Sequence, residues 1–414
     1  MWTALLDTML SWFFKTGTLN VTFPDGSTKS YGAGSPEAHV RIKDGRIIRR
    51  LVMQPELALG EGYMDGSIEI DDLRGFFKVA LPSVVNAERP WFQRPLDATK
   101  QTFRKLAQSN NILKARNNVA HHYDLSGELY DLFLDADKQY SCAYFARDDM
   151  TLDEAQEAKK HHIAHKLCLK PGMKVLDIGC GWGGMGLTLA RDYGAHVVGV
   201  TLSKEQHAIA VRRAEEAGLS DKCDFRIQDY RDVTETFDRI VSVGMFEHVG
   251  VPYYDEYFGK VKELLSDDGL ALIHTIGHVG PPNYSDPWMV KYIFPGGYSP
   301  ALSEMQASVD HHRLYTQDIE VLRTHYSKTL GMWHDRFMEK ADKARELYDE
   351  QFVRMWRYYL LCMEAAFMVG NLLVYQVQIG KHLAAAPVTR DYLYPYKGEK
   401  AAKSKSGKFV EAAE

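Results

Sequence analysis

One stretch of this chain constrains its fold more than any other: residues 174–186 read Lys-Val-Leu-Asp-Ile-Gly-Cys-Gly-Trp-Gly-Gly-Met-Gly. The apolar start predicts a strand that is buried on both faces. The glycines that follow let the backbone approach a ligand more closely than a Cβ atom would allow. Residues 185–193 then predict a helix whose first N–H groups point at that ligand. This order is typical of an α/β fold that holds a nucleotide-like molecule.

Two positions separate the candidate ligands. The glycine spacing alone would also suit NAD, whose binding fingerprint is similar. Asp177, however, lies before the first glycine, where class I methyltransferases place an acidic residue near S-adenosylmethionine (SAM). The second strand ends at Thr201, where an NAD-binding Rossmann domain usually supplies a carboxylate. Ser203 or Gln206 would then bond the ribose, so the pattern favours SAM, with a purely structural turn as the alternative.

Apolar segments alternate with helical patterns around this motif. Strands are expected at 174–178, 195–200, 223–227, 238–243 and 269–276, and helices near 152–168, 184–193, 204–217 and 253–265. This rhythm predicts a parallel, doubly wound sheet. Residues 351–381 predict a long, largely apolar helical region that caps the catalytic core.

The N-terminal part has a different pattern. Residues 2–14 predict an amphipathic helix, which either lies on a membrane or docks on its own domain. Short alternating runs between residues 19 and 70, separated by Asp-Gly turns, predict an antiparallel sheet with helices around 55–63 and 73–85.

The predicted organisation is therefore a small α+β domain joined to a class I SAM-methyltransferase α/β domain. The expected boundaries are 1–95 for a lipid- or membrane-contacting domain, 96–119 for a linker helix, 120–396 for the catalytic domain and 397–414 for a disordered lysine-rich tail.

Composition excludes several classes of protein. The net charge of −5 shows no electrostatic footprint for nucleic acid. The five cysteines form no CxxC pair, which is typical of a reducing cytosol and not of a zinc ribbon or disulfide framework. No apolar run approaches the roughly 20 residues that span a bilayer, and the N-terminus lacks signal-peptide features. A cytoplasmic protein is expected.

Polar residues at the ends of the later strands are candidates for chemistry. Asp229 and Tyr230 follow the third strand, where a carboxylate would accept from an adenine amino group and a ring would stack on the base. Glu247 follows the fourth strand and His274 ends the next, so both are expected at the carboxyl edge of the sheet, where ligands bind. A surface turn for the first pair, and a core histidine for His274, are the structural alternatives.

The histidine pairs at 121–122, 161–162 and 311–312 raise the question of a metal. Only His161 and His165 have the helical spacing of ligands, and the sequence shows no third ligand beside them. No metal site is expected.

Several motifs together resemble a known family. They are Tyr140-Ser-Cys-Ala-Tyr-Phe, Leu176-Asp-Ile-Gly-Cys-Gly-Trp-Gly, Gly199-Val-Thr-Leu-Ser-Lys-Glu-Gln, Gln228-Asp-Tyr-Arg-Asp, Arg239-Ile-Val-Ser-Val-Gly-Met-Phe-Glu-His-Val-Gly, His274-Thr-Ile-Gly and Tyr292-Ile-Phe-Pro-Gly-Gly-Tyr. In order and content they resemble the cyclopropane-fatty-acyl-phospholipid synthases and mycolic acid cyclopropane synthases. Leu59-Gly-Glu-Gly-Tyr-Met-Asp-Gly is similar to the bacterial phospholipid enzymes.

The resemblance implies transfer of a methylene group from SAM to the cis double bond of an acyl chain in a membrane phospholipid. It also implies a bound bicarbonate as the base, held by residues that here are Cys142, Glu247, His274, Ile276 and Tyr326. SAM contacts are implied from Tyr140, Ser141, Val175, Asp177, Gly179, Gly181, Gly183, Thr201, Leu202, Gln206, Asp229, Tyr230 and Arg231. The enzyme would associate peripherally with the inner face of the membrane, and a homodimer stays open.

One segment departs from the family pattern. Relatives commonly read His-Tyr-Asp and then Gly-Asn-Asp-Phe-Tyr, whereas this chain has His122-Tyr-Asp-Leu-Ser-Gly-Glu-Leu-Tyr130. This difference leaves acyl-chain and head-group preference open. Three other functions also stay open: C-methylation of the same alkene to a methyl branch, methylation of a small molecule or RNA on the same fold, and lipid binding without catalysis.

Overall fold

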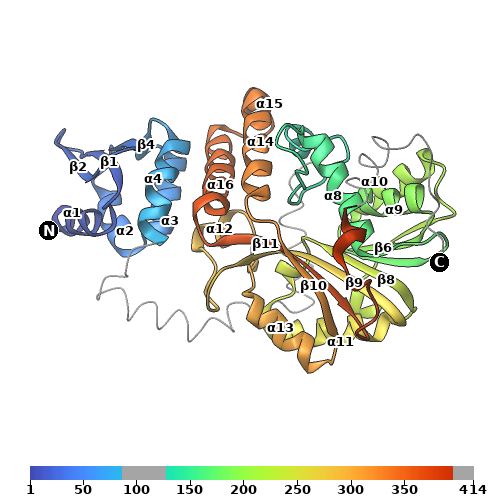
Figure 1. Ribbon diagram of the computed structural model, residues 1–414. Coiled ribbons are helices and arrows are strands. Elements are labelled where there is room, and N and C mark those ends of the chain that lie inside the picture. Colours follow the sequence, from blue (N-terminus) through green and yellow to red (C-terminus); the bar gives the residue numbers. More distant parts are fainter. Residues whose placement is uncertain (86–126, 395–414) are drawn as a thin grey trace, which may run out of the picture.

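The computed structural model describes residues 1–85 and 127–394, which form two β-sheets with helices around them (Figure 1). A four-stranded sheet lies in the N-terminal part and a seven-stranded sheet in the rest. The predicted linker helix 96–119 and tail 397–414 lie outside the described residues, so the domain boundaries stay a prediction.

The N-terminal sheet is mixed. Its elements are α1 (Trp2–Phe13), β1 (Gly17–Thr22), β2 (Thr28–Ala33), β3 (Glu37–Ile42), α2 (Arg46–Met53), α3 (Pro55–Asp65), β4 (Ile68–Ile70) and α4 (Leu73–Val85), with strand order β2-β1-β3-β4. The prediction of a wholly antiparallel sheet is wrong, because β1 and β3 run parallel. Since β2 ends with Ala33 opposite Gly17, at the start of β1, a short link suffices to begin β3 on the other side of β1.

Helix α1 docks on its own domain through one face. Leu6 and Met9 are buried in the same hydrophobic core as Leu19 of β1. Leu5 and Trp12 remain exposed. The docking interpretation is therefore confirmed for the face that carries Leu6 and Met9.

The second sheet has the predicted doubly wound arrangement. Its strands are β5 (Lys174–Ile178), β6 (His196–Thr201), β7 (Cys223–Ile227), β8 (Phe237–Val243), β9 (Leu265–His278), β10 (Tyr315–Val321) and β11 (Leu372–Gly380), in the order β10-β11-β9-β8-β5-β6-β7. Strands β5 to β9 run parallel. This is the fold of class I SAM methyltransferases.

Two antiparallel strands extend this sheet beyond the prediction. β11 pairs with β9, and β10 pairs with β11. The predicted helical region 351–381 is wrong in its second half: α16 (Glu350–Val369) ends before Gly370, and β11 follows. The β-branched residues Val374, Val377 and Ile379 favour the strand, and all three are fully buried.

Helices cover both faces of this sheet. The remaining α-helices of the described chain are α7 (Gly127–Asp131), α8 (Leu152–Lys166), α9 (Gly184–Tyr193), α10 (Lys204–Glu216), α11 (Tyr254–Leu264), α12 (Pro287–Tyr292), α13 (Leu302–His311), α14 (His325–Glu339) and α15 (Ala341–Leu347). Figure 1 shows α8, α9 and α10 on one side of the sheet, α11 and α13 on the other, and α14 and α16 between the sheet and the N-terminal part.

The strand order reverses between β5 and β8. In open α/β sheets a ligand crevice lies at such a point, beyond the carboxyl ends of the strands. Gly179 follows β5 and Gly244 follows β8, so the glycine turn of the sequence motif lies at this crevice. Among the described residues, no helix is both long and apolar enough to span a bilayer.

Candidate active site

A first cavity lies at the ends of β5, β6 and β7. Eight predicted SAM contacts line it: Gly179, Gly181, Thr201, Leu202, Gln206, Asp229, Tyr230 and Arg231. The turn opens the space, because Gly179 and Gly181 have φ angles of +80° and +54° and a Cβ atom on Gly181 would meet nothing within 4 Å. The residues present therefore fit a nucleotide-like ligand.

Hydrogen bonds fix the polar rim of this cavity. Thr201 Oγ1 donates to Gln206 Oε1 at 3.2 Å, and both residues are buried. On the next turn, the Asp229 carboxylate accepts from Arg231 Nε at 2.9 Å and Nη2 at 2.8 Å. The Arg231 guanidinium lies 5.3 Å from the centre of the Tyr230 ring. These contacts fix the side chains that are predicted from the sequence to bind the ribose and the adenine of SAM.

Three predicted SAM contacts line neither this cavity nor its neighbour. Val175 is fully buried at the start of β5, and Gly183 precedes α9 with a φ angle of +82°. Asp177 is buried behind the turn, where burial raises the pKa of its carboxyl to about 7. Its Oδ2 has no hydrogen-bond partner among the described residues.

A second, larger cavity adjoins the first and shares Gly244 and His248 with it. All five residues predicted to hold the base line it: Cys142, Glu247, His274, Ile276 and Tyr326. Tyr140 and Ser141, predicted as SAM contacts, also line this second cavity. Apolar side chains form much of the remaining wall: Leu81, Met289, Val290, Phe294, Met363 and Leu372. Polar residues outside the predicted set, among them Asn283, Asp286 and Asn371, line the cavity as well.

Glu247 lies in the 3-10 helix Phe246–His248, just after β8. Its Oε1 accepts from the backbone N–H of Ile276 at 2.6 Å. Its Oε2 is buried without a hydrogen-bond partner in the described part of the chain. Burial raises the pKa of this carboxyl to about 7, so the group can exchange a proton near neutral pH.

His274 lies in β9, opposite Val243 of β8. Its Nδ1 is 3.0 Å from Gln376 Nε2 of β11, and burial keeps the imidazole pKa well below its usual value. The ring is therefore neutral. His274 and Glu247 share one cavity as predicted, but within the described chain each is held by another group and no direct hydrogen bond joins them.

Burial also raises the pKa of the Cys142 thiol, which therefore stays protonated and is a poor nucleophile. Tyr326 is buried beside Phe367, with ring centres 4.6 Å apart.

Gln376 and Leu81 were not predicted. A buried glutamine within an apolar strand is itself a signal, since such a side chain needs a partner. Leu81 comes from α4, and no local sequence pattern shows that this helix reaches the cavity.

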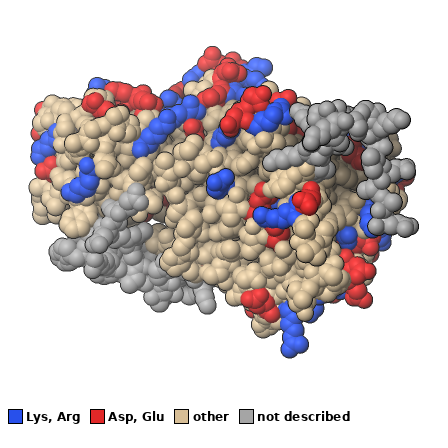
Figure 2. Space-filling model, in the orientation of Figure 1, with Lys and Arg blue, Asp and Glu red and all other residues tan. Residues whose placement is uncertain are grey.

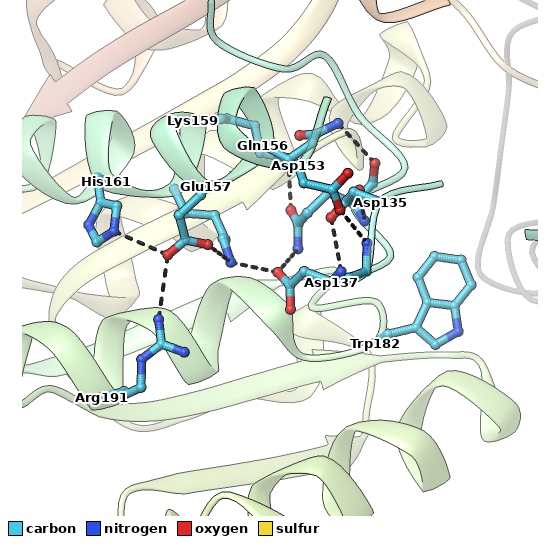
Figure 3. Close-up of polar contacts among 12 residues, drawn as sticks. Asp135, Asp137, Asp153, Gln156, Glu157, Lys159, His161, Trp182 and Arg191 are labelled. Carbon is cyan, nitrogen blue, oxygen red and sulfur yellow. Dashed lines mark hydrogen bonds and ion pairs between the residues drawn. The ribbon is translucent and has the colours of Figure 1, made fainter. Parts of the chain in front are cut away.

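One group of possible metal ligands does come together. Among the described residues, Glu157, His161 and Asp192 have ligand atoms within 4.8 Å of one another, whereas no third ligand beside His161 was expected from the sequence. Figure 3 shows Glu157 between His161 and Arg191. Glu157 also pairs with Lys160 at 2.7 Å, and Asp192 pairs with Arg191 at 2.7 Å. The two carboxylates are thus already neutralised by cations.

Comparison with known proteins identifies the family. Residues 110–377 match the family described as mycolic acid cyclopropane synthetase. The chain belongs to this family. Residues 5–83 match a second family, described as a domain of unknown function.

The cyclopropane-fatty-acyl-phospholipid synthase of Escherichia coli K12 is 40% identical over 344 residues, which cover 83% of this chain and 88% of that enzyme. A probable fatty acid methyltransferase of Pseudomonas putida is 36% identical over 388 residues, which cover 89% and 94%. Among solved structures, the mycolic acid cyclopropane synthase CmaA1 complexed with SAH and CTAB is 35% identical with a TM-score of 0.61, covering 64% of this chain and 97% of that one.

Proposed function

We propose that this enzyme transfers a methylene group from SAM to the cis double bond of an unsaturated acyl chain in a membrane phospholipid, which forms a cyclopropane ring. The observation that carries the proposal is the pair of adjoining cavities: one lies at the glycine turn, and the other is lined by many apolar side chains together with Glu247 and His274. The identity to the phospholipid synthase of E. coli over most of both chains supports the choice of substrate.

The first cavity would bind SAM, which supplies an electrophilic methyl group. Thr201 and Gln206 would hold the ribose, and Asp229 with Tyr230 the adenine. Gly244 and His248 line both cavities, so the methyl group would reach the alkene at that junction. An alkene is a weak nucleophile. The chain therefore contributes to the rate mainly by aligning the alkene with the SAM methyl group in a chamber that excludes water.

The second cavity would hold bicarbonate as the base that removes a proton from the transferred methyl group. The fit rests on Glu247, whose buried Oε2 has no hydrogen-bond partner among the described residues and whose raised pKa lets it donate a proton to an anion. The neutral His274 ring offers another hydrogen bond. Turnover in buffers stripped of carbon dioxide is expected to fall at least tenfold and to return with added bicarbonate. Unchanged turnover would exclude this role.

The decisive experiment incubates the purified enzyme with SAM and vesicles of a cis-monounsaturated phospholipid. The expected acyl product is heavier than the substrate by one CH₂ and resists mild hydrogenation as a ring does. Mass spectrometry of the released fatty acids, with fragmentation, identifies it. A protein that binds SAM but leaves the vesicles unchanged would refute the proposal.

C-methylation is the second candidate, because the P. putida relative is named a probable fatty acid methyltransferase. Here the cation formed by methyl transfer would lose a proton from a neighbouring chain carbon instead of from the transferred methyl group, which gives a methyl-branched alkene. The same fragmentation data distinguish branch from ring, and a branched product alone would establish this alternative.

Use of a membrane phospholipid requires contact with a bilayer, which we assign to the cytoplasmic face as a peripheral association. A homodimer remains a separate proposal, which sedimentation of the purified protein tests.

A further inference from the structure

The segment 139–142 lies in no helix or strand, although Tyr140, Ser141 and Cys142 line the second cavity. Such a segment needs external contacts to keep one conformation, because a free backbone gains about 1–2 kcal/mol of conformational entropy per residue. Helix α8 supplies these contacts. Gln156 and Lys159, on one face of α8, are both fully buried (Figure 3).

Gln156 holds the main chain of the segment. Its Nε2 donates to the carbonyl oxygen of Gln139 at 3.1 Å and to that of Ser141 at 2.9 Å. A single side-chain amide therefore bonds the backbone on both sides of Tyr140. This contact fixes the direction in which Tyr140 leaves the main chain.

Lys159 holds the side chains of the same two residues. Its Nζ donates to Gln139 Oε1 and to Ser141 Oγ, each at 2.7 Å. Burial lowers the pKa of this ammonium to about 8, while the nearby Asp135 acts in the opposite direction. In the described part of the chain no carboxylate pairs directly with Lys159. Burial of a lysine in that situation is costly, so its presence here points to a positional role.

Helix α8 is tied to the first cavity as well. Lys160 pairs with Asp137 at 2.7 Å, and Asp137 also pairs with Arg213 of α10. Arg213 Nη1 in turn donates to the carbonyl oxygen of Trp182, within the glycine turn, at 2.8 Å. The contacts of α8 thus fix segment 139–142 relative to the turn that begins the first cavity.

We infer that Gln156 and Lys159 are positioning residues that control whether the reaction ends in ring closure. The inference rests on the proposed function. The alkene π pair bonds to the SAM methyl carbon as the carbon–sulfur bond breaks, which leaves a cation. Ring closure then requires a base to take a proton from that methyl group, whose C–H electron pair forms the second carbon–carbon bond.

A displaced segment 139–142 would slow this last step. The cation would then react by other routes: water would add with loss of a proton to give an alcohol, or a neighbouring carbon would lose a proton to give a methyl-branched alkene. The distribution of products therefore reports the position of the segment, which a general loss of stability would not change.

The test compares Lys159→Met and Gln156→Met with the wild-type enzyme on monounsaturated phospholipid vesicles. Gln156→Met keeps the side-chain length, Lys159→Met shortens the side chain by its terminal atom, and both variants remove the donors. We expect turnover to fall at least tenfold, since misplacement by about 1 Å can cost about 100-fold. We also expect the fraction of branched or hydroxylated product to rise severalfold.

Thr151→Ala is the matched control, because it weakens the start of α8 without touching segment 139–142. Lys159→Gln keeps a donor and should give an intermediate product ratio, so it carries the test together with Gln156→Met if Lys159→Met does not fold. Product ratios equal to those of Thr151→Ala would overturn the inference. A wild-type enzyme that forms no ring would instead refute the proposed function.

Discussion

Glu247 combines three properties that a residue holding the base needs. It lines the second cavity, its Oε1 accepts a hydrogen bond from the Ile276 backbone, and its Oε2 is buried without a partner in the described structure. Glu247→Gln keeps the shape and one acceptor but cannot exchange a proton. We expect turnover to fall at least 100-fold with little change in the SAM dissociation constant, because the first cavity is untouched. Turnover close to that of the wild type would contradict the assigned role.

The same carboxyl gives a pH-dependent stability. Its pKa is raised from 4.5 to about 7 in the folded state. Between these values the unfolded state releases the proton and the folded state keeps it, so stability falls as pH rises from 4.5 to 7. The loss is on the order of 3 kcal/mol.

Urea unfolding of the wild type and of Glu247→Gln between pH 4.5 and 8, in bicarbonate-free buffer, measures this difference. The variant should lack this part of the pH dependence, and the difference should stop changing above pH 7. Parallel curves for the two proteins would show that Glu247 does not titrate in this range.

The sequence located Glu247 and His274 because strand ends in a parallel sheet meet at one edge. It could not locate Gln376, which contacts His274 from a strand that lies 102 residues further along the chain. Asp177 was recognised as acidic and close to the turn, yet its burial behind the cavity depends on packing that a local motif does not record.

Helix α8 begins with a capping box. Thr151 Oγ1 accepts from the backbone N–H of Glu154 at 3.3 Å, and Glu154 Oε2 accepts from the backbone N–H of Thr151 at 2.8 Å. Thr151→Ala should lower the free energy of unfolding by about 1 kcal/mol. Because Gln156 and Lys159 remain in place, the product ratio should not change. Chemical denaturation and product analysis of the same preparation check both expectations, and a shifted ratio would mean that the helix start itself positions the site.

Strand β11 shows why element type is harder to predict than element position. When an apolar strand follows a helix directly, the two read as one long helical pattern unless the end of the helix is recognised in the sequence. Here Gly370 follows the last helical residue, and the next segment finds its partner in β9. That pairing joins parts of the chain about a hundred residues apart, so periodicity within 351–381 could not reveal it.

The N-terminal part contributes directly to the site. Leu81 of α4 lines the second cavity, and Arg74 of the same helix pairs with Glu364 of α16 at 3.0 Å. Glu61 of α3 accepts from Tyr292, which follows the cavity-lining Met289 in α12, at 2.8 Å. Helices α3 and α4 thus contact the part of the chain that forms the second cavity, while the lipid-contacting role of residues 1–95 stays a prediction.

Exposed apolar side chains lie next to residues that line the second cavity. Met368 is 55% exposed at the end of α16, two residues after the lining residue Ala366, and Val279 is 60% exposed beside the lining residue His278. The Val279 N–H donates to the carbonyl oxygen of Asn371, another lining residue, at 2.8 Å. On the face in Figure 2, most charged side chains lie around the margins, and the middle of the face carries few of them. These features favour membrane contact close to the cavity.

Met368→Glu and Val279→Glu should therefore weaken binding to phospholipid vesicles about tenfold each, because burial of such a side chain in lipid is worth about 1.5–3 kcal/mol. Turnover on detergent-dispersed phospholipid should stay within twofold, since neither side chain lines the cavity. Leu5→Glu, on the exposed face of α1, is the matched control and should bind vesicles as the wild type does. Vesicle co-sedimentation measures all three. A loss confined to Leu5→Glu would instead assign the membrane contact to α1, and then the alternative interpretation of residues 2–14 would hold.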